Sequence, residues 1–188
     1  MRAWLAIAVM GAIVCTICDH LHVITGVLYY PKPFFWQQAW WVPPLFAGAS
    51  VVITASAQPT RALLGGAVVP PPLLRCTAGD MLAFVTAYAF TAYGNSLPNV
   101  VLAVLVAWWL ARVVAGAPPW LVVYSLLTAA GGTLFEAGWS KLGFFHYSNP
   151  DFIGVPRWLP GIYLHVAFLT ADLSTYVQPR RALAISRG

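Results

Sequence analysis

Charged side chains are scarce in this chain of 188 residues, and their scarcity excludes most soluble folds. Charged residues make up 8% of the sequence, whereas hydrophobic residues make up 60%. Soluble domains typically carry about 25% charged residues, which cover the surface that faces water. We therefore expect lipid to be the main solvent of this protein, and its function to lie in a bilayer or to open into one.

Six apolar stretches approach the roughly 20 residues that a helix needs to cross the hydrocarbon core. They cover residues 4–19, 41–57, 77–93, 100–114, 120–138 and 159–177. We expect the whole chain, residues 1–188, to form a single all-α transmembrane domain, a bundle of six helices. The first stretch is expected to remain in the mature protein, because no clear small-x-small cleavage site precedes Asp19.

The basic residues divide unequally between the two sides of this predicted bundle. With the N-terminus inside, seven fall on the inner side (Arg2, Arg61, Arg75, Arg112, Arg180, Arg181 and Arg187) and three on the outer side (Lys32, Lys141 and Arg157). The positive-inside rule then predicts that both termini are cytoplasmic. The net charge of +5 reflects this asymmetry. Because no basic stripe is present, we expect no nucleic-acid partner.

Lysine is rare as well, and this bears on the source of the chain. Only Lys32 and Lys141 are present, whereas Ala, Val, Gly, Pro and Arg are plentiful. Such a bias is typical of proteins encoded by GC-rich bacterial genomes. The composition therefore favours a bacterial plasma membrane as the location of this multi-pass protein.

Recognisable catalytic and metal-binding motifs are missing. The sequence has no GxSxG elbow, no phosphate loop and no HExxH. Cys15 and Cys18 form a CxxC pair, but Asp19 stands where the haem attachment motif requires His. Cysteine in an apolar helix behaves as a small hydrophobic residue. We therefore expect no metal and no cofactor other than a bound lipid.

A few imidazole and carboxyl side chains leave an enzymatic interpretation open. Asp19, His20, His22 and His146 could meet at the predicted outer interface as an acid–base group, and Glu136 lies near the same side. General acid–base catalysis needs such groups within hydrogen-bond reach of one another and of the substrate. The alternative to a binding protein is thus a small membrane enzyme that acts on a lipid headgroup at the outer face.

Three acidic residues lie inside the apolar stretches, namely Asp80, Glu136 and Asp172. Ionisable groups are costly in a bilayer and often functional there. Each could face a polar cavity, or each could reach the interface or cap a neighbouring helix, since all lie within two turns of an end. We expect at least one to face a cavity that opens sideways to the bilayer. Such a cavity would be lined by spans two to six, with Asn95, Asp80 or Glu136 holding a hydroxyl group.

Small residues follow the start of the second stretch and recur in the fifth. Residues 47–50 and 129–132 are Ala, Gly or Ser, which let helix backbones approach closely. Packing within the bundle explains such runs, yet they exceed what one six-helix bundle obviously needs. They therefore predict a symmetric homo-oligomer, with a trimer favoured over a dimer.

The second and sixth stretches each begin with tryptophan followed by proline. Proline suits a first helical turn, so these segments fit a rigid helix start. Alternatively, Pro44 or Pro160 loosens the backbone hydrogen bonding and opens a seam between helices to lipid. Both starts resemble the Insig family, the sterol-regulated membrane proteins of the endoplasmic reticulum. The matching blocks are AWWVPP, which contains Trp40, Trp41, Pro43 and Pro44, and YSNPDF followed by WLP, which contains Asp151, Trp158 and Pro160.

The resemblance implies a six-helix bundle that binds a lipidic small molecule among its helices, an oxysterol in the animal proteins. It implies a sensor or adaptor and not a catalyst, located in the endoplasmic reticulum if the chain is eukaryotic. The family's ligand contacts map onto Trp108, Asn95 and an aromatic position that is either Phe84 or, by a second count, Asp80. For a bacterial chain, a diacylglycerol is a plausible substitute for a sterol.

One departure from the family pattern concerns the protein partner. Animal Insigs place an Asp after the tryptophan pair at the cytoplasmic end of the fourth span, where it grips Scap. Arg112 stands at this position here. The reversed charge argues against a Scap-like partner.

Overall fold

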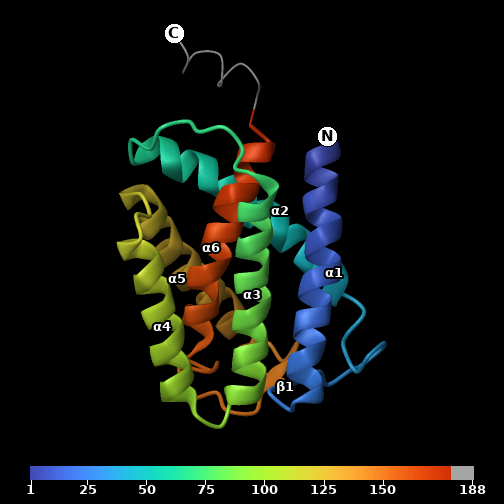
Figure 1. Cartoon of the computed structure of the whole chain (residues 1–188). Helices are drawn as coiled ribbons and strands as arrows, with labels where there is room; N and C mark the ends of the chain where they lie inside the picture. The colour runs from blue at the N-terminus through green and yellow to red at the C-terminus, as the bar shows by residue number, and fades with distance from the viewer. Residues whose placement is uncertain (179–188) are drawn as a thin grey trace.

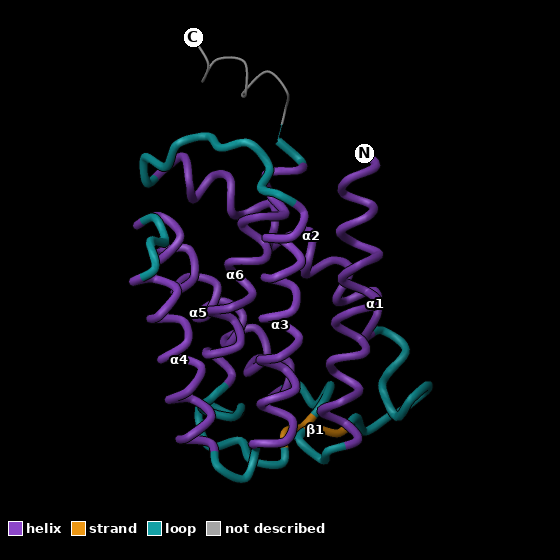
Figure 2. Tube along the Cα trace, in the orientation of Figure 1, coloured by secondary structure: helices purple, strands orange, loops and turns teal. Residues whose placement is uncertain are grey.

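The structure, a computed structural model, describes residues 1–178 (Figures 1 and 2). Its helices are α1 (Arg2–Ile24), α2 (Val42–Leu63), α3 (Leu74–Gly94), α4 (Pro98–Val114), α5 (Pro119–Lys141) and α6 (Leu159–Tyr176), and its strands are β1 (Leu28–Tyr29) and β2 (His146–Tyr147). The helices coincide with the six predicted stretches, so the all-α, six-helix class is confirmed. Arg180, Arg181 and Arg187, which contribute to the predicted orientation, lie outside the described residues.

Proline marks the start of four helices. Pro43, Pro98, Pro119 and Pro160 occupy the first or second position of α2, α4, α5 and α6. There the missing N–H costs nothing, because the first helical N–H groups have no partner within the helix. The proline-rich segments therefore act as helix starts, and helix α2 continues through Pro59 to its end at Leu63.

A short antiparallel sheet ties two distant loops together at one end of the bundle. Leu28 pairs with Tyr147, and Tyr29 pairs with His146. Each strand is reached through a glycine with positive φ just after a helix, Gly26 (φ 72°) after α1 and Gly143 (φ 79°) after α5. This left-handed conformation ends helices and suits glycine, which has no Cβ. We call the end with the sheet the outer end, and the opposite end, where α1 begins, the inner end (Figure 1).

Helix α6 lies at the centre of the bundle. It packs against α2, α3, α4 and α5, and most of its residues are buried. Close approach requires small residues: a Cβ on Gly161 would lie 2.9 Å from Leu105 of α4. The last turn of α6 and the first turn of α1 lie at the inner end together (Figure 1).

Large apolar side chains face outward on α1, α4 and α5. Leu5, Ile13 and Ile17 of α1 are more than half exposed, and Val114 of α4 and Leu134 of α5 are as well. Among the helices of residues 1–178, α1 and α5 are long and apolar enough to cross a bilayer, and α4 is apolar but has 17 residues. An apolar outer surface of this kind suits contact with lipid tails better than contact with water.

Candidate functional site

A cavity of about 650 Å³ lies between α2 and α5. Its lining comes mainly from these two helices, and its outer end also receives side chains from α1, α3, α6 and the sheet. Helix α4, which packs against α3 and α6, contributes no lining residue, whereas α1 contributes Asp19 and His22. The cavity thus differs from the prediction of a lining by spans two to six, because α4 lies on the far side of α6.

The mouth of the cavity is apolar. Val52 of α2 and Leu127 and Phe135 of α5 line it and are exposed. Gly48 and Gly131 also line it, and a Cβ added at either would meet nothing within 4 Å. The small residues of α2 and α5 therefore leave open space here in addition to packing helices. A space of this kind is wide enough and apolar enough to accept a chain of methylene groups between the two helices.

The outer end of the cavity is polar, and Glu136 of α5 lies there. Tyr163 of α6 donates a hydrogen bond of 2.5 Å to Oε1 of Glu136, and Tyr147 of β2 donates one to Oε2. Both carboxylate oxygens thus have a phenolic donor. Glu136 is the residue among the predicted ligand-binding set that lines this cavity.

Asp19 is the second carboxylate at this end, and it is 5% exposed. Tyr30 donates to its Oδ2 at 2.7 Å, and Gln38 donates to the same oxygen at 2.6 Å. Burial, together with the charge of Asp19, raises the pKa of Tyr30 above its ordinary range. Tyr30 therefore stays protonated and remains a donor across the physiological pH range.

His22 lies one helical turn from Asp19 and also lines the cavity. Its Nε2 is 2.9 Å from the hydroxyl of Thr91, which itself donates to the carbonyl of Tyr88. Because the Thr91 proton is engaged, His22 Nε2 must carry the proton of this hydrogen bond. The ring stacks on Tyr88 with a centroid separation of 4.9 Å. These contacts hold His22 rigidly at the cavity wall.

Two histidines of the predicted acid–base cluster lie apart from this cavity. His20 Nδ1 is hydrogen-bonded to the carbonyl of Trp36 at 3.0 Å, and His146 packs against Tyr29. The structure brings Asp19, His22 and Glu136 to one cavity. His20 and His146 are used to hold the outer loops.

Two other predicted ligand-binding residues, Asp80 and Trp108, lie nearer the inner end of the bundle or within its core. Asp80 pairs with Arg112 near the inner end, and the Arg112 guanidinium lies 3.7 Å from the centre of the Phe168 ring. Trp108 packs against the ring of His165 at 4.4 Å. These side chains join α3, α4 and α6 and do not line the larger cavity. The partner of Arg112 thus lies within its own chain.

Phe84 lies in a second, smaller cavity of about 80 Å³ among α1, α2, α3 and α6. This space is lined mainly by apolar side chains, including Met10, Met81 and Leu173. Phe84 is 5% exposed and packs edge-on against Tyr88. Tyr88, Tyr163 and Ile53 line both cavities, so Phe84 contacts the wall of the larger one from behind.

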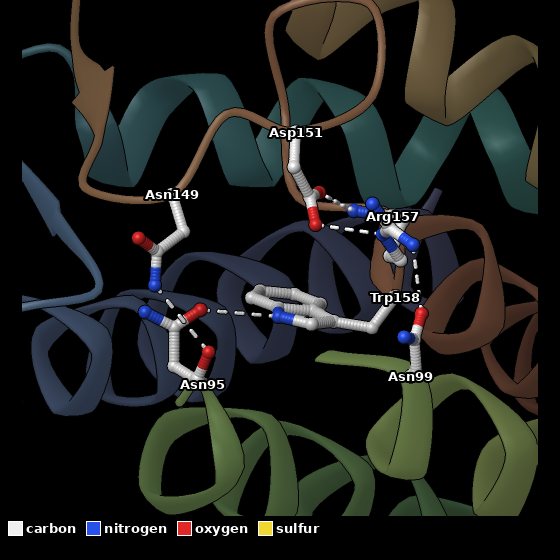
Figure 3. Close-up of polar contacts among 6 residues, drawn as sticks. All are labelled: Asn95, Asn99, Asn149, Asp151, Arg157 and Trp158. Carbon is white, nitrogen blue, oxygen red and sulfur yellow. Dashed lines mark hydrogen bonds and ion pairs between the residues drawn. The ribbon is translucent and has the colours of Figure 1, made fainter. Parts of the chain in front are cut away.

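Asn95 belongs to a polar network at the outer end (Figure 3) and lines neither cavity. Its Oδ1 accepts a hydrogen bond of 3.1 Å from Nε1 of Trp158. Asp151 accepts from the backbone N–H and Nε of Arg157, both at 2.7 Å, and Arg157 in turn donates to Asn99 at 2.7 Å. This network fastens the loop between α3 and α4 to the start of α6. The motif residues Asp151 and Trp158 therefore have a structural explanation.

The motif residues of the AWWVPP block surround the start of α2. Trp41 and Pro44 line the cavity, while Trp40 is 70% exposed and Pro43 is part-buried. Trp41 also packs on Trp139 and Tyr30. Tyr30, Tyr147, Tyr163 and Gln38, which complete the polar end, carried no sequence signal. They come from a loop, a strand and a helix that meet only through packing at the outer end.

Comparison with known proteins identifies the family. No family model matches the chain. The chain is 30% identical to the INSIG protein homolog of Mycolicibacterium vanbaalenii, over 92% of this chain and 85% of that protein. The crystal structure of a mycobacterial Insig homolog from Mycobacterium vanbaalenii matches with a TM-score of 0.79 and 26% identity, over 100% of this chain and 96% of that one. A cross-linked trimer of an arginine-to-cysteine variant of that homolog matches with a TM-score of 0.79 and 25% identity. The AWWVPP and PDF–WLP blocks, the six-helix fold and this similarity together show that the chain belongs to the Insig family.

Proposed function

We propose that this protein is a lipid-binding, Insig-like membrane protein that acts as a sensor or adaptor. The observation that carries the proposal is the cavity of about 650 Å³, apolar along its length and polar at its outer end. Ligand sites in proteins commonly combine an apolar wall with a few polar groups that orient the ligand. A neutral lipid, diacylglycerol-like or sterol-like, fits this division between apolar wall and polar end.

The proposal places all six helices across a bacterial plasma membrane, with both termini in the cytoplasm. It is supported by the apolar outward faces of α1, α4 and α5 and by the basic residues on the predicted inner side. The start of α1 and the end of α6 share one end of the bundle, as an even number of crossings requires (Figure 1).

We further propose a homo-oligomer, with a trimer favoured. The support is the cross-linked trimer of the mycobacterial homolog, together with the exposed apolar helix faces. A Scap-like partner is not expected, because Arg112 is held by Asp80 and carries the opposite charge to the family residue. Crosslinking in native membranes, read on a denaturing gel, tests the assembly. A monomer band alone would contradict the proposal, provided that the same crosslinker captures a known oligomer in a parallel control.

Native mass spectrometry of the purified protein tests the binding function. We expect a stoichiometric neutral lipid to remain bound after mild detergent extraction. The matched control is a Gly131→Leu variant, in which the new side chain would fill the cavity mouth. We expect the variant to fold and to lose the lipid. A wild-type protein that carries no lipid, and takes up none when it is supplied, would refute the proposal.

The second candidate function is that of a lipid headgroup enzyme. It is favoured by the convergence of Asp19, His22 and Glu136 on one cavity. Incubation of the protein with membrane lipids, followed by lipid mass spectrometry, separates the two functions. Chemical turnover that disappears in a His22→Ala variant would establish the enzyme, whereas lipids recovered unchanged support the binding protein.

A further inference from the structure

The carboxylate of Asp19 is occupied on one side only. Tyr30 and Gln38 both donate to Oδ2, and no group among residues 1–178 donates a hydrogen bond to Oδ1. Asp19 is 5% exposed and lines the cavity. Oδ1 is open to the cavity, and a group that donates a hydrogen bond to it from there would be bound favourably.

Glu136 provides the contrast within the same cavity. Each of its two oxygens already accepts a tyrosine hydroxyl, from Tyr163 and Tyr147. His22 Nε2 is likewise engaged with Thr91. Among the described acidic groups of the cavity, Asp19 is therefore the one with an oxygen that accepts no hydrogen bond from the protein.

The charge of the cavity limits which donor is suitable. None of the described residues that line it is a lysine or an arginine, while two are carboxylates. A ligand with an anionic head would place a negative charge in an apolar space beside two carboxyl groups, without a compensating cation. A head with acceptors only, such as an ester, would leave Asp19 Oδ1 without a donor.

We propose that Asp19 anchors the ligand by accepting the hydrogen bond of its head group at Oδ1, so that the cavity selects lipids with a free hydroxyl. Lipids whose head lacks a donor, or is anionic, are excluded by the same carboxylate. This inference rests on the proposed lipid-binding function and adds to it the anchoring residue and the chemical class of the head. The side chain of Asp19 comes from α1, which the expected ligand contacts did not include.

A competition between three lipids with the same acyl chains tests this anchor. The delipidated full chain is supplied in detergent with 1,2-dioleoylglycerol and either 1,2-dioleoyl-3-acetylglycerol or dioleoyl phosphatidic acid, and the bound lipid is read by native mass spectrometry. One hydrogen bond to a charged acceptor corresponds to about a tenfold difference in affinity or more. We expect the wild-type protein to prefer dioleoylglycerol over each competitor by at least this factor.

An Asp19→Asn variant replaces the hydrogen-bond acceptor that faces the cavity with a donor, while the side chain keeps nearly the same shape. Tyr30 and Gln38 require an acceptor, so the Asn oxygen should take the place of Oδ2 and the amide N–H should face the cavity. We expect the preference for dioleoylglycerol over its acetyl ester to vanish or invert. Asp172→Asn, the same chemical change in α6 away from this cavity, should keep the wild-type preference.

The outcomes separate the anchor from the proposed function. If Asp19→Asn keeps the wild-type preference, or if Glu136→Gln alone abolishes it, the assignment to Asp19 is overturned. Equal binding of phosphatidic acid and dioleoylglycerol by the wild-type protein would overturn it without any variant. If the wild-type protein binds none of the three lipids, the lipid-binding function itself is refuted.

Discussion

Trp158 shows how much a single motif residue contributes at the outer end. Its side chain is fully buried, its Nε1 donates to Asn95, and its ring contacts His22 and Tyr147. The indole therefore connects α6 with the loop after α3 and with the polar wall of the cavity. Tryptophan satisfies both demands because it buries a large apolar area and keeps one polar N–H for a partner.

A double-mutant cycle measures this connection. Trp158→Phe removes the N–H donor and leaves Asn95 Oδ1 without it, and we expect a loss of about 1–3 kcal/mol in unfolding free energy. The Asn95→Ala variant alone should lose less unfolding free energy than Trp158→Phe. The loss in the double variant should be smaller than the sum of the two single losses by about 1 kcal/mol. Thermal unfolding in detergent reads the effect. Strictly additive losses would show that the hydrogen bond contributes nothing to stability.

Between elements, helices α5 and α6 approach each other closely. A Cβ on Gly132 would lie 2.2 Å from the ring of Tyr163, so only glycine permits this contact. The contact also places the Tyr163 hydroxyl on Glu136. Gly131, the residue before Gly132 in α5, lines the cavity, and a Cβ added there would have nothing within 4 Å. Adjacent glycines of one helix thus serve packing and open space respectively.

The two glycines make a matched pair of variants. Gly132→Ala should displace Tyr163 and destabilise the protein by about 1–3 kcal/mol, because overpacking forces side chains and backbone to shift. Gly131→Ala should be neutral or stabilising by up to about 1 kcal/mol, since alanine favours the helix. Melting temperatures of the two variants under identical conditions measure the difference in stability between the two positions. Equal effects at both positions would contradict the assigned contact.

At the scale of the whole molecule, the polar groups of the bundle gather at its two ends. The inner end holds Asp80 paired with Arg112, and Arg61, whose guanidinium lies 4.3 Å from the centre of the Trp120 ring. The outer end holds the polar wall of the cavity and the network around Asp151 (Figure 3). The outward faces between the ends are apolar. This distribution matches the polarity profile of a bilayer.

The orientation of the bundle is tested by labelling from outside intact cells. In a background with Cys15, Cys18 and Cys76 replaced by serine or alanine, Asn149→Cys lies in an exposed outer-end loop and Val68→Cys in the exposed loop between α2 and α3. We expect a membrane-impermeant maleimide to modify the first and spare the second. Lysed cells, in which both should react, provide the control, and the reversed pattern in intact cells would show an inverted topology.

The helices and the site differ in how far they could be predicted. The six predicted stretches match the helices because hydropathy and proline are local properties of the chain. Among the ligand-binding candidates, Glu136 lines the cavity, whereas Asn95 and Asp80 find partners in Trp158 and Arg112. A polar residue in an apolar stretch signals that it needs a partner, and its position in the chain does not say whether the partner is a ligand or another side chain.

The sequence by itself determined the membrane class, the number and approximate ends of the helices, and the family, since each rests on patterns within short segments. Only the tertiary structure decided which side chains share the cavity. Asp19, Tyr30, Glu136 and Tyr163 come from α1, the loop between β1 and α2, α5 and α6. Their meeting depends on how each helix is rotated about its axis. That rotation is set by close contacts between helices, such as Gly11 with Ser50 and Gly132 with Tyr163, and packing of this kind is a property of helix pairs and not of any one segment.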